Sequence, residues 1–433
     1  MPALFQDAAF WAMALFLIPL LLRVPIAVSL GFATIAVTFV WDLGLDMLSY
    51  NFFANIVKYP LLAVPFFILA GNIMDKASIA DKIIVFINEL VGDLTGGLAV
   101  AAIGVALFWG AVSGSTSATV AAIGIILIPG MVKAGYDKAF ATAVVCSASG
   151  LAIIIPPSIT FILYAVVTGV SVGAIFAAGF IPGIIIGLFM MISAYLTSRK
   201  RGYRGEPRTN GLKGILIAAK DAFWALMTPV VILGGIYGGV FTPTEAAAVA
   251  CFYGLIVGTV IYHKIGWKDV WDILVETLNA SAAVMIVSAT AGLYSWIGST
   301  VGLIEKVSAL LLGISSNEII ILLMIYVILF IAGMLLDGVS IVYVFVPLLI
   351  PLIKQFNWDP VWFGVMFTIM VSVGTITPPV AMNLYVGCRI SGLTMEDLTP
   401  PVIPLLVATL LALAFLTAFP WFTTVLPRTL GLM

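Results

Sequence analysis

An internal repeat sets the plan of this chain. Five residues of the kinds that begin or interrupt helices occur twice, and the two copies always lie 222 positions apart. They are Pro129, Asp137, Pro156, Pro157 and Pro182 in the first half, and Pro351, Asp359, Pro378, Pro379 and Pro404 in the second. Five matches at a single offset favour an internal duplication over two unrelated sets of kinked helices. We therefore expect two halves built on the same arrangement of helices.

The composition places both halves in a membrane. Hydrophobic residues make up 63% of the 433 residues and charged residues only 9%, and the mean hydropathy is +1.22. A soluble chain could not bury so much apolar surface, and its long continuous apolar runs differ from the short alternating segments of a membrane β-barrel. We predict an all-α polytopic membrane protein. The formal net charge of −1 argues against a nucleic-acid partner.

Each half contains two apolar segments joined by a tip of small and hydroxyl residues. The first tip covers residues 110–119, between apolar segments at 99–109 and 120–128. These segments have roughly 10–15 residues, whereas a membrane-spanning helix needs about 20. We predict a re-entrant hairpin whose tip faces protein or a watery cavity, because unpaired backbone groups cannot face lipid. The second half carries the corresponding tip at residues 333–340.

Each half also contains an apolar helix interrupted by two prolines. The first is expected over 138–168 and the second over 359–390. A proline inside a helix frees a backbone carbonyl from the helical hydrogen bonds. Interrupted helices at corresponding positions of two halves are the best sequence indication of the binding site of a secondary transporter.

These features divide the chain into four predicted parts. The hairpin and the interrupted helix of each half form a transport repeat, and the polar stretch that begins at Arg199 separates the halves. The parts are 1–96 (scaffold and arm helices), 97–198 (first transport repeat), 199–316 (polar loop and second scaffold and arm region) and 317–433 (second transport repeat with the last crossing).

The distribution of basic residues predicts the orientation. If the loop at 199–220 is cytoplasmic, 15 of the 19 Lys and Arg residues fall on the cytoplasmic side, as the positive-inside rule requires. The N-terminus is then periplasmic. Asp137 falls inside and its repeat Asp359 outside, so the repeats are inverted and the two hairpins enter from opposite faces with their tips near the midplane.

The residues at the tips and breaks suit Na⁺. This ion prefers oxygen ligands, which Ser and Thr hydroxyls and freed carbonyls supply. The predicted ligands are Ser113, Ser115, Ser147 and Gly150 in the first half, and Gly333, Asp337, Ser372, Thr375 and Thr377 in the second. Small residues also allow membrane helices to pack closely, so a packing role stays open for any single serine.

A small anionic substrate is expected beside the ions. The half-helices that follow Ser115 and Gly338 have N-termini with partial positive charge, which favours a carboxylate. The predicted substrate contacts are Ser115, Thr116, Ser117, Ser149, Ser158, Thr377, Asn383 and Arg389. For Arg389 a simpler role remains open, in which the side chain extends to the membrane interface.

Two carboxylates have structural explanations. Asp337 precedes Gly338 and fits the N-cap of the helix that follows, although a role as a cation partner is compatible with capping. Glu245 stands three residues after Thr242, which predicts a capping box.

The same segments resemble a known family. The motifs Val64-Pro-Phe-Phe-Ile-Leu-Ala-Gly-Asn72, Ala111-Val-Ser-Gly-Ser-Thr-Ser-Ala-Thr119, Ile155-Pro-Pro-Ser158 and Pro378-Pro-Val-Ala-Met-Asn-Leu-Tyr385 are similar to those of the large membrane (DctM- or SiaM-like) subunit of tripartite ATP-independent periplasmic (TRAP) transporters. The resemblance implies an elevator-type, Na⁺-coupled importer of small organic acids in the bacterial inner membrane. It also implies two partners, a small four-helix membrane subunit and a periplasmic substrate-binding protein.

Two other classes are distinguishable from this one. A stand-alone Na⁺/dicarboxylate symporter would share the opposed hairpins and the elevator motion, but it would transport without a binding protein. A membrane-embedded enzyme would need a nucleophile with a base or a metal motif. The single histidine, His263, lies beside Lys264 at an expected helix end, so we expect no enzyme.

Overall fold

The computed structural model describes residues 7–91, 94–203 and 211–433, and the regular structure within these ranges is helical throughout. The first half contains α1 (Ala8–Leu21), α2 (Ile26–Val40), α3 (Asp46–Ile56), α4 (Ala63–Lys76), α5 (Ile79–Val91), α6 (Gly97–Ser113), α7 (Thr116–Lys133), α8 (Lys138–Ser149), α9 (Ile159–Thr168) and α10 (Val172–Arg201). The second half contains α11 (Gly211–Asp221), α12 (Phe223–Tyr237), α13 (Pro243–Ile256), α14 (Trp267–Thr300), α15 (Leu303–Ile314), α16 (Glu318–Leu335), α17 (Gly338–Gln355), α18 (Pro360–Thr375), α19 (Met382–Ser391), α20 (Met395–Ala418) and α21 (Trp421–Thr429). Arg204 and Arg208, which contribute to the predicted orientation, lie outside the described residues.

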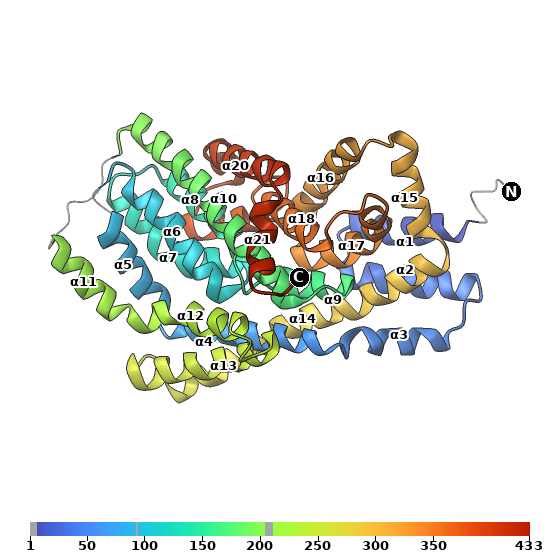
Figure 1. Cartoon of the computed structure of the whole chain (residues 1–433), viewed down its shortest axis with the longest axis horizontal. Coiled ribbons are helices and arrows are strands. Elements are labelled where there is room, and N and C mark those ends of the chain that lie inside the picture. Colours follow the sequence, from blue (N-terminus) through green and yellow to red (C-terminus); the bar gives the residue numbers. More distant parts are fainter. Residues whose placement is uncertain (1–6, 92–93, 204–210) are drawn as a thin grey trace.

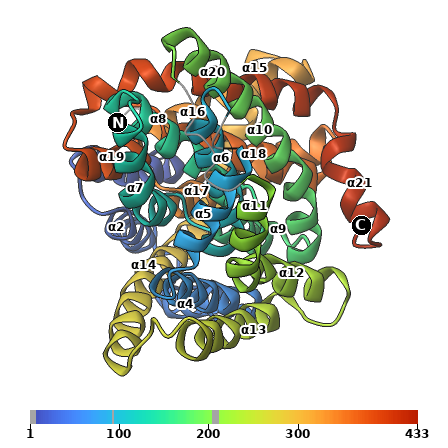
Figure 2. The ribbon, with the colours of Figure 1, turned by 90° about the vertical axis from the view of Figure 1, so that its left-hand side faces the viewer.

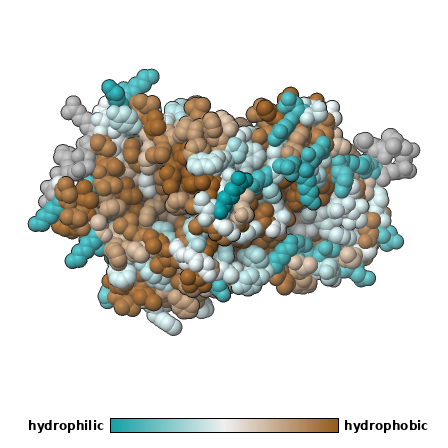
Figure 3. Space-filling view, viewed as in Figure 1, coloured by the Kyte–Doolittle hydropathy of each residue, from teal (hydrophilic) through white to brown (hydrophobic). Residues whose placement is uncertain are grey.

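The chain is an integral membrane protein. Among the described residues, seven helices are long and apolar enough to cross a membrane, or up to nine if two strongly bent helix pairs each form one span. Apolar side chains also cover much of the molecular surface (Figure 3). Helices that expose apolar residues on their outer faces need lipid as their solvent, so the predicted all-α membrane class is confirmed.

The helices of the two halves correspond at the offset of 222 positions. Helices α7 and α17 begin at corresponding residues, and so do α8 and α18. Asp137 accepts a hydrogen bond from the backbone N–H of Phe140, and Asp359 accepts one from that of Val361, so both repeated aspartates are N-caps. An N-cap aspartate pairs a backbone donor that the first helical turn leaves free.

The two helix breaks contact each other. The first break follows α8 and a short 3₁₀ turn (Gly150–Ile153), and the second follows α18. Ser372 Oγ donates a hydrogen bond of 2.8 Å to the carbonyl of Gly150, and these two residues are themselves 222 positions apart. The Pro156–Pro157 and Pro378–Pro379 bonds are both cis. The centre of the protein therefore brings corresponding residues of the two halves together.

Four helices build the two helical hairpins, α6 with α7 and α16 with α17. They have 17 or 18 residues each, which corrects the expected segment length of roughly 10–15 residues. The expected segments 99–109 and 120–128 were too short at both ends, because the helices continue through most of the tip and α7 also continues past Pro129 to Lys133. At about 1.5 Å per residue such helices are nearly as long as the hydrocarbon core is thick.

The helices outside the hairpins differ between the halves. Helices α3 and α4 form a pair bent by 58°, whereas the corresponding part of the second half is the single α14 of 34 residues. The charged residues Lys268, Asp269 and Asp272 ahead of the apolar run at 280–297 predict a surface helix followed by a separate crossing, and the continuous α14 shows that this prediction is wrong. Helix α14 lies beside α3 and α4 along one edge of the elongated molecule (Figure 1). Figure 2 shows α4, α13 and α14 on one side and α8, α10 and α20 on the other, with α6 and α17 between them.

The last crossing differs from its predicted bounds, whereas the predicted capping box is present. The apolar run at 404–425 predicts the last crossing there, but the structure has α20 over Met395–Ala418, followed by the separate short helix α21. The capping box before α13 is confirmed, because Thr242 Oγ1 accepts from the backbone N–H of Glu245 while the Glu245 carboxylate accepts from that of Thr242.

Candidate substrate and ion site

The hairpin tips and helix breaks enclose one cavity of about 550 Å³. The first tip contributes Ser113, Gly114, Ser115, Thr116 and Ser117, the second contributes Asp337, Gly338 and Val339, and the breaks contribute Ile153, Ile159, Thr160 and Thr375. Six predicted site residues thus line a common space, namely Ser113, Ser115, Thr116, Ser117, Asp337 and Thr375. Polar groups from segments far apart in sequence converge there, as they do in small-molecule binding sites.

The tip of the first hairpin is held against the first helix break. Gly114 has a φ of +61°, and a Cβ atom at this position would lie 2.9 Å from the carbonyl oxygen of Pro157. Glycine therefore satisfies both the left-handed backbone and the close approach. The carbonyl of Ser115 accepts hydrogen bonds from Ser113 Oγ at 3.3 Å and Thr119 Oγ1 at 2.8 Å, which order the tip.

Asp337 forms the tip of the second hairpin. Its carboxylate accepts from the backbone N–H of Val339 at 3.2 Å and from the hydroxyl of Ser340, so the predicted N-cap role is confirmed. At the corresponding N-cap of α7, Ser115 makes no capping hydrogen bond through its side chain. The second tip thus contributes a carboxylate to the cavity, whereas the first leaves N–H groups of α7 without a side-chain cap.

Two buried oxygens without partners lie on neighbouring segments. In the described part of the chain, Ser147 Oγ and Asn383 Oδ1 have no hydrogen-bond partner, although the two residues are 1% and 0% exposed. Asn383 Nδ2 donates to the carbonyl of Cys146 at 3.2 Å, which places α19 against the end of α8. A buried polar atom without a partner costs free energy, and a bound cation would remove that cost.

Several other predicted site residues do not line the cavity. Local hydrogen bonds engage Ser149 Oγ with the carbonyl of Val145, Ser158 Oγ with that of Ile153, and Thr377 Oγ1 with that of Val373. Gly150 and Ser372 bond to each other, as described above, and Gly333 packs on Gly374. Ser147 and Asn383 do not line the cavity either.

Arg389 lies on the surface. Its guanidinium donates to Tyr385 Oη at 3.0 Å and stacks over the same ring, with Cζ 4.8 Å from the ring centroid. The side chain is exposed and does not line the cavity. This position agrees with the interfacial role left open for Arg389.

One wall of the cavity comes from α4 and α14, which contain none of the predicted site residues. Gly71, Asn72 and Asp75 of α4 and Ala280 and Val284 of α14 complete the lining. Asn72 Nδ2 donates to Thr277 Oγ1 of α14 at 3.0 Å. Asn72 and Asp75 interrupt an otherwise apolar helix, which was the available signal, but nothing local indicates that this helix faces the hairpin tips.

Comparisons with known proteins agree with this architecture. The family "Tripartite ATP-independent periplasmic transporter, DctM component" matches residues 13–422. The isethionate TRAP transporter permease protein DctMQ of Oleidesulfovibrio alaskensis is 38% identical over 94% of this chain, which spans 65% of that relative's length. The C4-dicarboxylate TRAP transporter large permease DctM of Pseudomonas aeruginosa is 36% identical, with 89% of this chain and 90% of the relative covered.

Two further similarities complete the comparison. The sialic acid TRAP transporter large permease SiaM of Vibrio cholerae is 35% identical, with 93% of this chain and 95% of the relative covered. The crystal structure of the YdaH transporter of Alcanivorax borkumensis has a TM-score of 0.62 at 15% identity, covers 95% of this chain and 99% of its own, and supports the fold alone. The resemblance drawn from the motifs is therefore confirmed. The chain is a membrane transport permease, not an enzyme, and it belongs to the DctM family of tripartite ATP-independent periplasmic transporters.

Proposed function

We propose that this permease imports a small organic acid together with Na⁺ through the cavity between the two hairpin tips. One observation carries the proposal: both tips and both helix breaks contribute to a single cavity of about 550 Å³. The relatives named above transport isethionate, C4-dicarboxylates and sialic acid, all of which are small anions. We expect a substrate of this class.

The polar groups in and near the cavity form two sets, one that suits an anion and one that suits a cation. On the first tip, the N-terminus of α7 has no side-chain cap, so its partial positive charge is available to a substrate carboxylate. On the cation side, Ser147 Oγ and Asn383 Oδ1 are hard oxygens without partners, which fits Na⁺. Asp337 adds a negative charge that a cation would balance.

The proposed transport cycle is an elevator motion. The permease would lie in the inner membrane with a periplasmic N-terminus, the orientation that places 15 of the 19 basic residues on the cytoplasmic side. In this orientation the two hairpins would be re-entrant and would enter from opposite faces. The hairpins and interrupted helices would slide as a unit past a frame that includes α1, α2, α12 and α13. A site that holds only Na⁺ or only the anion would carry uncompensated charge within the membrane, at a cost of several kcal/mol. Movement would therefore require both to be bound.

The proposed assembly has three components. A periplasmic binding protein would deliver the organic acid, and a small four-helix membrane subunit would stabilise the static frame within the lipid bilayer. The tripartite family to which the chain belongs supports this arrangement over the stand-alone Na⁺/dicarboxylate symporter.

A matched pair of serines tests the Na⁺ site. Ser147 and Ser149 both lie buried near the end of α8, but only the Ser149 hydroxyl has a partner. We expect NaCl to raise the melting temperature of the purified permease more than the same concentration of KCl, because a ligand at 100 times its Kd stabilises by about 2.7 kcal/mol. Ser147→Ala should abolish most of this Na⁺-specific shift and Ser149→Ala should retain it. Equal shifts in the two variants would contradict the assignment.

Uptake measurements test the coupling. Proteoliposomes that contain the permease, its small subunit and its binding protein should accumulate radiolabelled succinate, sialic acid or isethionate when Na⁺ is outside. Replacement of external Na⁺ by K⁺ should stop uptake. Uptake driven by a proton gradient alone would refute Na⁺ coupling, and full uptake without the binding protein would favour the stand-alone symporter.

A further inference from the structure

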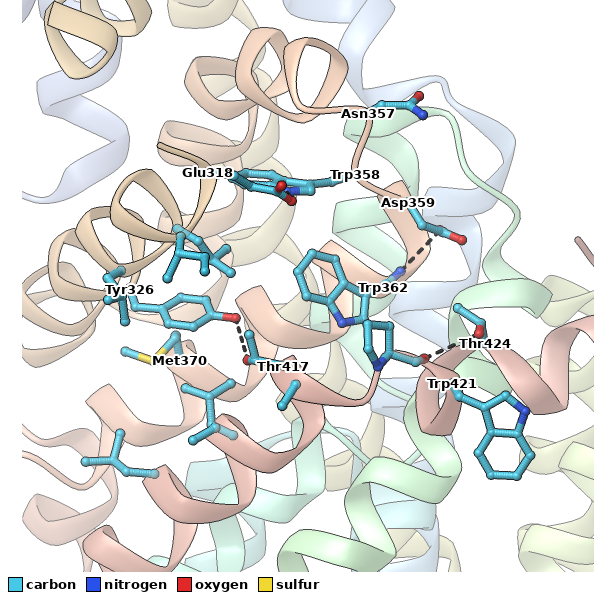
Figure 4. Close-up of a pocket in the computed structure, with 18 of the residues that line it drawn as sticks. Glu318, Tyr326, Asn357, Trp358, Asp359, Trp362, Met370, Thr417, Trp421 and Thr424 are labelled. Carbon is cyan, nitrogen blue, oxygen red and sulfur yellow. Dashed lines mark hydrogen bonds between the residues drawn. The ribbon is translucent and has the colours of Figure 1, made fainter. Parts of the chain in front are cut away.

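A second and larger cavity lies away from the candidate site. Helices α16, α18, α20 and α21 enclose about 1210 Å³ (Figure 4). Its walls are mainly apolar, formed by Leu322, Val327, Phe330, Leu410, Leu413 and Ala414. Val327, Leu410 and Ala414 are exposed, so this cavity is a groove open to the surface.

The groove has a polar end. Glu318, Asn357 and Asp359 gather there in Figure 4, and Arg428 of α21 also lines the groove. Trp358 Nε1 donates to the Glu318 carboxylate at 2.5 Å, which fixes one wall. Two carboxylates thus stand at one end of an otherwise apolar space that a guanidinium also lines, which suits an occupant with a zwitterionic head and an apolar tail.

Trp362 lies between the polar end and the apolar wall. Its side chain is 6% exposed, and its Nε1 has no hydrogen-bond partner among the described residues. By contrast, Tyr326 Oη, farther along the groove, pairs with Thr417 Oγ1 at 2.9 Å. A buried N–H group without an acceptor is costly, so an occupant of the groove should supply an acceptor to Trp362.

The first repeat fills the corresponding space with its own chain. Tyr136 and Phe140 stand 222 positions before Trp358 and Trp362. Tyr203 stacks on Tyr136 and packs at a tilt against Phe140, with ring centroids 4.5 and 5.7 Å away, and α10 packs directly on α6. In the second repeat the corresponding helices, α20 and α16, both line the groove. The groove in the second repeat is therefore left for an occupant from outside the chain.

We propose that this groove binds a membrane phospholipid with a primary amine in its headgroup, such as phosphatidylethanolamine. One acyl chain would lie along the wall formed by α16 and α20, and an ester carbonyl would accept from Trp362 Nε1. The ammonium group would face Glu318 and Asp359, and the phosphate would face Arg428. A helix of another protein fits less well, because its backbone carbonyls point along its own axis, so only a polar side chain of that helix could accept from the indole.

Native mass spectrometry of the delipidated permease tests the proposal. With added palmitoyl-oleoyl phosphatidylethanolamine, we expect one lipid to be retained by the wild-type protein. Trp362→Phe keeps the ring but loses the donor, and retention should weaken about fivefold. Ala414→Trp fills the groove and should reduce retention at least tenfold. The matched control is Leu411→Trp on the same helix, which is 57% exposed and does not line the groove, so it should bind as the wild type does.

The outcomes separate the possible occupants. Melting temperatures without lipid check that each variant is folded, and Arg428→Gln, at an exposed position, offers a further variant if Ala414→Trp does not fold. Equal retention of phosphatidylethanolamine and phosphatidylglycerol would overturn the headgroup assignment. Unchanged retention in both Trp362→Phe and Ala414→Trp, or in Trp362→Phe and Arg428→Gln when Ala414→Trp is unfolded, would overturn the site. Dimers that Ala414→Trp dissociates would show that a second copy of the chain occupies the groove instead.

Discussion

The two halves of this permease share one arrangement of helices but differ in how the outer surfaces of their hairpins are covered. In the first half, α5 packs on α6, and Tyr203 stacks on Tyr136 and Phe140. In the second half, α15 packs on α17 and the outer side of α16 borders a groove of about 1210 Å³. The internal repeat thus preserves the helix order and the breaks, while single residues and connecting helices decide which surfaces remain open.

The hairpin tips show a second difference. The first tip begins α7 at Ser115, which makes no side-chain cap, whereas the second begins α17 at the capping residue Asp337. The two halves therefore present different charges to one cavity. In the proposed function this asymmetry would let an anion and a cation bind side by side, which two identical tips would not favour.

The largest expected effect concerns the crossing of each hairpin helix over a break. In the second repeat Gly374 packs on Gly333, and a Cβ atom at Gly374 would overlap the Cα and the carbonyl group of Gly333, with the carbonyl oxygen at 2.8 Å. Gly374 corresponds to Ala152 of the first repeat, which has a Cβ of its own and packs on Gly110. We expect Gly374→Ala to lower the free energy of unfolding by about 3 kcal/mol, because backbone cannot move aside as a side chain can.

Thermal unfolding in detergent measures this effect, and Ala152→Gly provides the matched control. That reverse change should cost only about 1 kcal/mol, since it removes a methyl group and adds backbone freedom. Similar losses in the two variants would show that the two crossings are not packed differently.

The next largest effect is expected from the packing of Tyr203, which covers the first repeat. The residue 222 positions after Tyr203 is Val425, so Tyr203→Val makes the first half resemble the second. The change removes two ring contacts and the hydrogen bond that Tyr203 Oη accepts from the Asp137 N–H at 3.1 Å. We expect a loss of about 2 kcal/mol. Tyr203→Phe, which keeps the ring, should lose less than half of that in the same melting experiment.

A smaller effect tests the bond between the two breaks. Ser372→Ala leaves the buried carbonyl of Gly150 without its cross-repeat donor and should cost about 1–2 kcal/mol. Ser391→Ala is the control, because its buried hydroxyl bonds to the Gly387 carbonyl within the same helix. If denaturant unfolding gives equal losses for both serines, the contact between the repeats contributes no more than a local bond.

The smallest effect concerns the anchoring of α15. Lys306 Nζ of α15 lies 2.6 Å from the carboxylate of Asp7, just before α1, and this pair has no counterpart in α5. The hydrogen bond from Lys306 holds the pKa of Asp7 below its ordinary value. Because both side chains are partly exposed, Lys306→Met should cost only about 0.2–1 kcal/mol at neutral pH.

The pH dependence of this pair has a definite sign. A carboxylate with a lowered pKa stabilises the folded state above its ordinary pKa, and this contribution is lost as the pH falls through the folded-state value. The stability difference between wild type and Lys306→Met should therefore shrink on acidification, and also in high salt. A difference that grows at low pH would exclude the ion pair as its source.

Local chemistry made much of the fold predictable. The proline and aspartate repeats, the hairpin tips and the capping roles of Asp337 and Glu245 are visible in the sequence, because caps and helix breaks depend on residues a few positions apart. The family followed from the same motifs. The length of the hairpin helices and the continuity of α14 did not, because an apolar membrane chain carries few signals where a helix extends without interruption.

Only the tertiary structure decided which hydroxyls reach the cavity. Ser115 and Thr375 line it, whereas Ser149 and Thr377 do not, although all four stand in similar sequence surroundings. The contribution of Asn72 depends on the packing of α4 against the tips. Helices that are apolar on every side give no periodic pattern to indicate which face turns inward, so neighbouring helices determine that face.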